Sequence, residues 1–215
     1  LLYNERRQKD SIKLFEISDV YTKNTEIKQQ KTLGLIVSGR LGNNYNDFSK
    51  KLDSNYLSKL LNKEYAKDIF QIIEISRDGL DTKKKDKIYY AEISFDNIPS
   101  SFFSDLSAQH KAINFINYEP ISEYPSSTRD FSFLVSDFNL VSEVIDMLEK
   151  VSDDLIKNSF LFDYYRNDET KIIKLGYRFI FQSHHKTLSD IEINKRVNKI
   201  LSPILAIEGV SIPGM

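Results

Sequence analysis

The stretch from residue 172 to residue 183 constrains the fold more than any other part of the sequence. Its large hydrophobic residues alternate with residues that are mostly polar or small: Leu175, Tyr177, Phe179 and Phe181 against Lys174, Gly176, Arg178, Ile180 and Gln182. Successive side chains of a strand point to opposite faces of a sheet. The pattern therefore predicts a long strand in a half-buried sheet, with one face packed on a core and the other open.

The elements around this strand follow a definite order. We expect strands at 130–135, 159–165, 172–183 and 209–212, with helices at 139–153 and 189–205. This order is that of the ferredoxin-like βαββαβ fold, in which an antiparallel four-stranded sheet carries both helices on one face. Asp190 and Glu192 fall in the first turn of the second helix, where the helix dipole favours negative charge.

The first half of the chain predicts a separate α+β domain. We expect strands at 12–21 and 32–38 around a polar turn at 23–31, a helix at 53–67, and strands at 69–75 and 87–95. A short helix is expected at 104–116, between two proline-containing breaks. The predicted division is therefore a domain of residues 1–117 and a ferredoxin-like domain of residues 118–215.

Composition excludes several classes of protein. Cysteine is absent, so disulfides, thiolate nucleophiles and cysteine metal sites are all excluded, and a cytoplasmic location is expected. No apolar run reaches the roughly 18 residues of a membrane span, and the polar N-terminus does not resemble a signal peptide. Because the chain starts with leucine rather than methionine, we expect a piece of a larger protein.

Charge is unevenly distributed along the chain. Residues 1–117 carry 19 basic and 16 acidic side chains, whereas residues 118–215 carry 11 and 15. An acidic domain attracts nucleic acid only if its basic residues share one face. Such a concentration does occur between residues 166 and 187, where Arg166, Lys171, Lys174, Arg178 and Lys186 stand against Asp168 and Glu169. A basic edge that is merely solvated remains an alternative interpretation.

No catalytic or metal site can be assembled from the sequence. Adjacent His184 and His185 point in different directions on a strand or turn and lack a third ligand nearby. Residues 39–42 lack the lysine and glycine spacing of a phosphate loop. No nucleophile has an adjacent base. We therefore expect this chain to be non-catalytic and to bind no cofactor or metal.

Four motifs of the second half resemble a known family. They are residues 129–135 (RDFSFLV), 161–165 (LFDYY), 178–183 (RFIFQS) and 187–193 (TLSDIEI). In this order and spacing they resemble the ferredoxin-fold anticodon-binding domain of phenylalanine–tRNA ligase beta chains. Residues 14–21 and 37–39 resemble the adjoining domain, a non-catalytic copy of the class II synthetase fold that packs against the catalytic alpha subunit.

The resemblance implies a function in translation. The second domain would bind the anticodon region of phenylalanine tRNA, and the first would support assembly with the alpha subunit. In the parent aminoacyl-tRNA synthetase, ATP and magnesium activate phenylalanine in that alpha subunit. This chain would contribute positioning and tRNA identity rather than bond formation.

An open sheet face with polar and aromatic groups suits unpaired bases, which can stack and form hydrogen bonds there. Arg178 can stack on a base or bind a phosphate, and Tyr165 can stack on a base. Ser132, Asp163 and Gln182 can form hydrogen bonds with base edges and so distinguish bases. The predicted RNA-binding set is Asp130, Ser132, Asp163, Tyr165, Lys174, Arg178, Gln182 and Lys186.

Two other functions stay open at this point. Ferredoxin-like sheets also serve as regulatory or protein-interaction modules without RNA binding, because a fold alone does not fix a function. A small hydrolase acting on acyl phosphates would use Arg129, but no glycine-rich loop accompanies it. The neighbouring Arg129 and Asp130 can equally form a structural ion pair or contact RNA directly.

Overall fold

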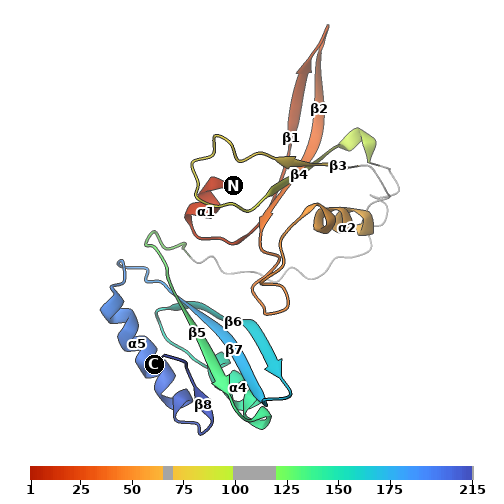
Figure 1. Cartoon of the computed structure of the whole chain (residues 1–215). Helices are drawn as coiled ribbons and strands as arrows, with labels where there is room; N and C mark the ends of the chain where they lie inside the picture. The colour runs from red at the N-terminus through yellow and green to blue at the C-terminus, as the bar shows by residue number, and fades with distance from the viewer. Residues whose placement is uncertain (65–69, 99–119, 215) are drawn as a thin grey trace, which may run out of the picture. The chain divides into compact units, whose positions relative to one another are not determined.

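The computed structural model describes residues 1–64, 70–98 and 120–214, which fall into two compact units (Figure 1). The first unit comprises residues 1–41 and 50–118, and the second comprises residues 42–49 and 119–215. The short segment 42–49 thus joins the second unit, which nothing in the sequence order indicated. The helix expected at 104–116 and the boundary expected after residue 117 lie outside the described residues.

An antiparallel four-stranded sheet organises the first unit. Strands β1 (Ser11–Lys23), β2 (Ile27–Gly39), β4 (Ile88–Ser94) and β3 (Gln71–Ile75) follow one another in the order β1-β2-β4-β3. Helix α2 (Ser54–Glu64) packs on it, and the shared core consists of buried Val37, Leu52, Leu57, Leu61 and Ala91. Helix α1 (Leu2–Arg6) precedes the sheet, and the 3₁₀ helix η1 (Phe95–Asn97) follows β4.

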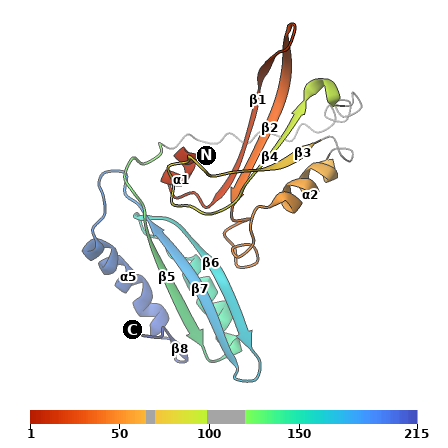
Figure 2. The ribbon, with the colours of Figure 1, turned by 45° about the horizontal axis from the view of Figure 1, so that its top comes forward.

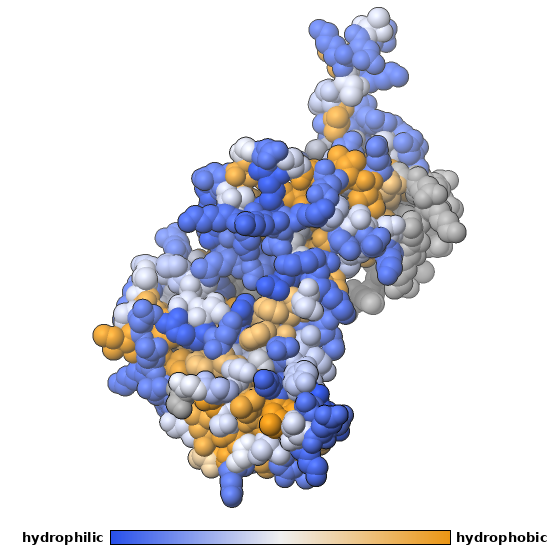
Figure 3. All heavy atoms as spheres, viewed as in Figure 1, coloured by the Kyte–Doolittle hydropathy of each residue, from blue (hydrophilic) through white to orange (hydrophobic). Residues whose placement is uncertain are grey.

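The hairpin of β1 and β2 is longer than the sequence predicted. Its register runs without a break from Ser11 opposite Gly39 to Lys23 opposite Ile27, so the expected turn at 23–31 is wrong. Residues 28–31 are polar and exposed, so they lack the alternation that marks a half-buried strand. They continue the antiparallel pairing with β1 through main-chain hydrogen bonds. The projecting end of this hairpin is mainly hydrophilic (Figure 3).

Local capping sets the start of α2 and the end of β2. The Asp53 carboxylate accepts a hydrogen bond from the Tyr56 N–H at 2.7 Å, which satisfies a free donor at the helix start. Gly39 ends β2 with a φ of +92°, and a Cβ there would lie 2.0 Å from the Asp10 carbonyl oxygen. Only glycine fits this position.

The second unit has the predicted ferredoxin-like fold. Its strands are β5 (Ser127–Val135), β6 (Ile156–Asn167), β7 (Ile172–Phe181) and β8 (Val210–Ser211), paired antiparallel in the order β6-β7-β5-β8. Helices α4 (Val141–Glu149) and α5 (Asp190–Leu205) lie against the same face of the sheet (Figure 2). The α+β class and the βαββαβ order are confirmed.

The predicted alternation along β7 matches the burial of its side chains. Leu175, Tyr177, Phe179 and Phe181 are buried in a core with Phe133 and Val135 of β5, Val144 and Leu148 of α4, and Ile193, Val197, Leu201 and Ile204 of α5. Burying one such side chain contributes roughly 1.5–3 kcal/mol. This core covers one face of the sheet, and the helices leave the other face uncovered. Within the described ranges, no helix is long and apolar enough to cross a membrane.

Helix α4 is shorter than expected, and α5 begins where expected. A 3₁₀ turn, η3 (Phe138–Leu140), precedes α4, which ends at Glu149 rather than at residue 153. The Asp153 carboxylate accepts the Leu155 N–H at 3.0 Å and so forms a local turn that competes with the helix. A capping box of Ser189 and Glu192 begins α5.

Candidate nucleic-acid interface

Six of the eight predicted RNA-binding residues lie together on the sheet face opposite the helices, here called the open face. Asp130 of β5 stands opposite Arg178 of β7, and Ser132 stands opposite Gly176. On the other side of β7, Asp163 stands opposite Gly176 and Tyr165 opposite Lys174. Directly opposed residues share a face, so strand pairing alone brings these side chains together.

The centre of the open face is a bidentate ion pair. Arg178 donates from Nε to Oδ1 and from Nη2 to Oδ2 of Asp130, each at 2.7 Å. The Arg178 side chain is 19% exposed and that of Asp130 is 42% exposed. A fork-shaped contact of this kind fixes the plane of the guanidinium, so Arg178 presents a defined planar cation.

Aromatic side chains surround this cation. The guanidinium carbon of Arg178 lies 5.1 Å from the ring centre of Phe48 and 5.3 Å from that of Phe162. Phe48, which belongs to segment 42–49 of the same unit, also has its ring centre 5.0 Å from Phe162 and 6.1 Å from Phe160. Sequence reasoning missed this aromatic cluster of Phe48, Phe160 and Phe162.

A β-bulge explains why Phe160 and Phe162 were missed. The register of β6 against β7 shifts between Leu161 and Asp163, so the side-chain alternation of β6 is interrupted there. Gly176 accommodates the shift, because a Cβ at this position would lie 2.7 Å from the Asp163 Cβ and 3.0 Å from Phe162 Cζ. The bulge lets Phe162 and Asp163 both approach the backbone of β7 on the open face.

Tyr165 and Lys174 form the more exposed end of the open face. The Tyr165 ring is 51% exposed and Lys174 is exposed beside it. On β5, Ser132 is exposed as well. A flat aromatic ring next to a solvated ammonium group can stack a base while the cation neutralises a phosphate.

The other two predicted residues have structural partners away from this centre. Gln182, just after β7, donates from Nε2 to the Tyr124 carbonyl at 2.6 Å and accepts a hydrogen bond from Lys157. Lys186 lies before α5 and donates to Glu192. The Lys186 ammonium and the hydrogen bonds at Ser189 lower the pKa of Glu192 to about 2. Lys186 therefore supports the start of α5.

Arg129 and Asp130 do not pair with each other. Arg129 instead forms an ion pair with Asp190 at the start of α5 and donates to Ser127 Oγ at 2.9 Å. Asp130, one residue later in the strand, pairs with Arg178 on the open face. The sequence left a structural pair and an RNA contact as alternatives; in the structure the two residues have separate ion-pair partners.

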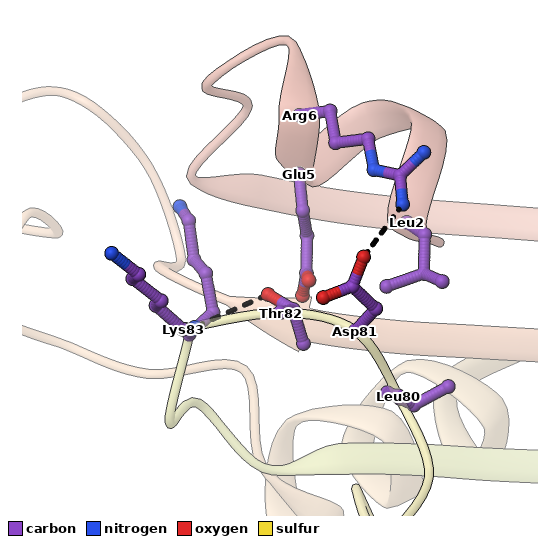
Figure 4. A pocket seen from close by; sticks show the side chains of 8 residues that line it. Leu2, Glu5, Arg6, Leu80, Asp81, Thr82 and Lys83 are labelled. Atoms are coloured by element: carbon purple, nitrogen blue, oxygen red, sulfur yellow. Dashed lines mark hydrogen bonds and ion pairs between the residues drawn. The ribbon is translucent and has the colours of Figure 1, made fainter.

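A pocket in the first unit offers no comparable chemistry. Glu5 extends from α1 into it, while Arg6 and Asp81 form an ion pair at its edge at 3.3 Å (Figure 4). Burial opposes ionisation of Glu5, but hydrogen bonds from Arg77 and Thr82 and the charges of Arg77 and Lys84 outweigh it, so the pKa of Glu5 is lowered. Glu5 thus serves as the buried partner of Arg77, 2.8 Å away. Across the described ranges, no group of three acidic or histidine side chains is placed to hold a metal.

Two family models match the chain. Residues 122–211 match the ferredoxin-fold anticodon binding domain, and residues 1–87 match the phenylalanyl tRNA synthetase beta chain CLM domain. The first match covers the whole βαββαβ sheet with its open face, and the second covers β1, β2, α2 and β3. Both matches agree with the resemblance carried by the sequence motifs.

Relatives support the same assignment over most of the chain. The chloroplastic phenylalanine–tRNA ligase beta subunit of Porphyra purpurea is 24% identical over 94% of this chain and 33% of its own length. That of Carboxydothermus hydrogenoformans is 25% identical over 97% of this chain and 29% of its own length. The chain thus spans about a third of the length of these relatives. With both family models, these matches show that the chain belongs to the phenylalanine–tRNA ligase beta-subunit family.

Proposed function

We propose that the second unit binds the anticodon region of phenylalanine tRNA through its open face. The observation that carries the proposal is the planar Arg178 guanidinium, fixed by Asp130 and flanked by aromatic rings, with exposed Tyr165 and Lys174 nearby. Anticodon bases are unpaired, so their faces can stack on such groups and their edges can meet Ser132 and Asp163.

In this proposal the chain itself makes and breaks no bonds. The first unit would support assembly with the alpha subunit of a phenylalanine–tRNA ligase, where phenylalanine, ATP and magnesium would be bound. Anticodon binding would supply orientation and tRNA identity. The proposed compartment is the cytoplasm, supported by a cysteine-free sequence that suits reducing compartments.

A salt-dependent binding titration tests the RNA part of the proposal. The 215-residue chain is titrated with a phenylalanine tRNA anticodon stem-loop, beside the variants Arg178→Ala and Arg129→Ala. Arg129 is the matched control, because it neighbours Asp130 in β5 but pairs with Asp190 instead. We expect Arg178→Ala to weaken binding about fivefold or more, by roughly 1–3 kcal/mol, and Arg129→Ala to change it less than about twofold.

Two further results complete the test. Wild-type affinity should fall as salt rises, because contacts with phosphates release counterions. A stem-loop with a changed anticodon should bind more weakly. If the folded protein does not bind the stem-loop even at low salt, the open face is instead a regulatory or protein-interaction surface.

A further inference from the structure

Phe48 of segment 42–49 lies on the open face, where the proposed function places RNA. Besides the contacts of Phe48 with Phe160, Phe162 and Arg178, the ring centre of Tyr45 lies 5.5 Å from that of Tyr164. Two aromatic side chains of one short segment therefore rest on strand β6. This segment is separated from β6 by more than 100 residues in the sequence.

Asn44 holds the segment in a defined conformation. Its side-chain oxygen accepts hydrogen bonds from the N–H groups of Asn46 at 3.0 Å and Asp47 at 3.1 Å. Its carbonyl oxygen accepts the Phe48 N–H at 2.8 Å, and its amide group donates to the Asp47 carboxylate at 3.0 Å. The tight turn restricts the backbone at Phe48 independently of the sheet. This lowers the entropic cost of placing its ring on β6.

The seated Phe48 ring occupies the space beside Phe162 and Arg178 in which a base would stack. It approaches Phe162 at an interplanar angle of 47° and lies beside the guanidinium of Arg178. Nucleic-acid bases use the same two kinds of group, phenylalanine rings and arginine planes, but stack on them with near-parallel planes. Because Phe48, Phe162 and Arg178 are in mutual contact, a base can stack on this part of Phe162 or Arg178 only after Phe48 leaves.

We propose that Phe160, Phe162 and Arg178 form a base-stacking subsite and that Phe48 caps this subsite when RNA is absent. This inference rests on the proposed function and adds a competing ligand within the chain. The cap reduces the apparent affinity for RNA by the fraction of molecules in which it is open. RNA binding in turn displaces segment 42–49 from β6.

The variant Phe48→Ala tests the competition directly. Removing the ring should lower the Kd for the anticodon stem-loop by roughly threefold to tenfold, because the subsite no longer has to be vacated. Phe15→Ala is the matched control, since Phe15 is an exposed phenylalanine of β1 in the first unit, and it should leave the Kd unchanged. Tighter binding by Phe48→Ala alone, or binding by that variant where the wild type binds none, would support the cap.

The opposite outcomes are equally informative. Weaker binding by Phe48→Ala would make Phe48 part of the RNA-contacting surface, and an unchanged Kd would mean that the ring and the base do not compete; either result overturns the proposal. Absence of binding by both proteins overturns the subsite together with the anticodon-binding proposal.

Hydrogen exchange separates the cap from the RNA proposal. In the absence of RNA, Phe162→Ala should speed amide exchange at Asp47 and Phe48 relative to the wild type, because the cap loses its main ring contact. Unchanged exchange would overturn the cap whatever the RNA result. Faster exchange with no RNA binding would keep Phe48 seated on β6 but remove the base-stacking role. Added stem-loop should also speed exchange in the wild type.

Discussion

The two faces of the second unit's sheet use the same strands for different purposes. Toward the helices, Phe133, Leu175 and Phe179 are almost completely buried among apolar neighbours. Away from the helices, Asp130 and Arg178 form an ion pair beside aromatic rings, and Tyr165 remains half exposed. Strand β7 contributes alternate residues to both faces. Substitutions at successive positions of β7 should therefore affect stability and RNA binding alternately.

The largest effect is expected on the buried face. Phe179→Ala removes a fully buried ring that contacts Phe131, Tyr177 and Phe181, so it leaves a cavity. We expect a loss of about 3–5 kcal/mol in the free energy of unfolding, measured by urea denaturation. A loss below about 1 kcal/mol would mean that this face is not the core.

Gly176 should be an exception to this alternation, because it lies on the open face and yet should affect stability. Although it lies on the open face, Gly176→Ala would bring a Cβ within 2.7 Å of the Asp163 Cβ. The β6 bulge would have to shift, and we expect a destabilisation of about 1–3 kcal/mol, seen as a lower midpoint in urea. Ser132→Ala, opposite Gly176 on β5, serves as the control and should change stability by less than about 0.5 kcal/mol.

Tyr165 should affect RNA binding without affecting stability. Tyr165→Ala removes an exposed ring, so the free energy of unfolding should change little, whereas binding of the stem-loop should weaken by about 1–3 kcal/mol if the ring stacks on a base. Tyr165→Phe keeps the ring and should retain most of the affinity. Equal losses in both variants would assign the effect to the hydroxyl group instead.

The smallest effect concerns acid stability at α5. Hydrogen bonds from Lys186 and Ser189 lower the pKa of Glu192 from 4.5 to about 2. The stabilisation is therefore fully present above the unfolded-state pKa and is lost as pH falls from about 4.5 toward 2. The difference in unfolding free energy between wild type and Glu192→Gln should be larger at pH 7 than at pH 3. A pH-independent difference would contradict the lowered pKa.

Sequence reasoning worked where periodicity or capping is local. The alternation from Leu175 to Phe181 and the order of elements predicted the sheet, and Asp190 and Glu192 marked the start of α5. The length of the β1–β2 hairpin was not predictable in this way, because its solvated residues 28–31 carry no alternation. Solvated strands owe their pairing to main-chain hydrogen bonds, which side-chain patterns do not reveal.

The candidate site was predictable only in part, for a related reason. Strand alternation placed Asp130 and Arg178 on one face, but the bulge in β6 obscured Phe160 and Phe162. Phe48 contacts β6 from a distant part of the sequence, and contacts of this kind produce no periodic pattern in the sequence. Gln182 was predicted from strand alternation and Lys186 from the basic run between residues 166 and 187, and the structure gives them Tyr124 and Glu192 as partners.

RNA binding by the open face is tested most directly by NMR. Amide chemical shifts of the isotopically labelled chain are mapped during titration with the anticodon stem-loop. We expect perturbed amides to gather on β5, β6 and β7 around Asp130, Tyr165 and Arg178, and in segment 42–49, while α4 and the outer side of α5 change little. Perturbations centred on α4 and α5, or none at all with the protein folded, would contradict an RNA-binding open face.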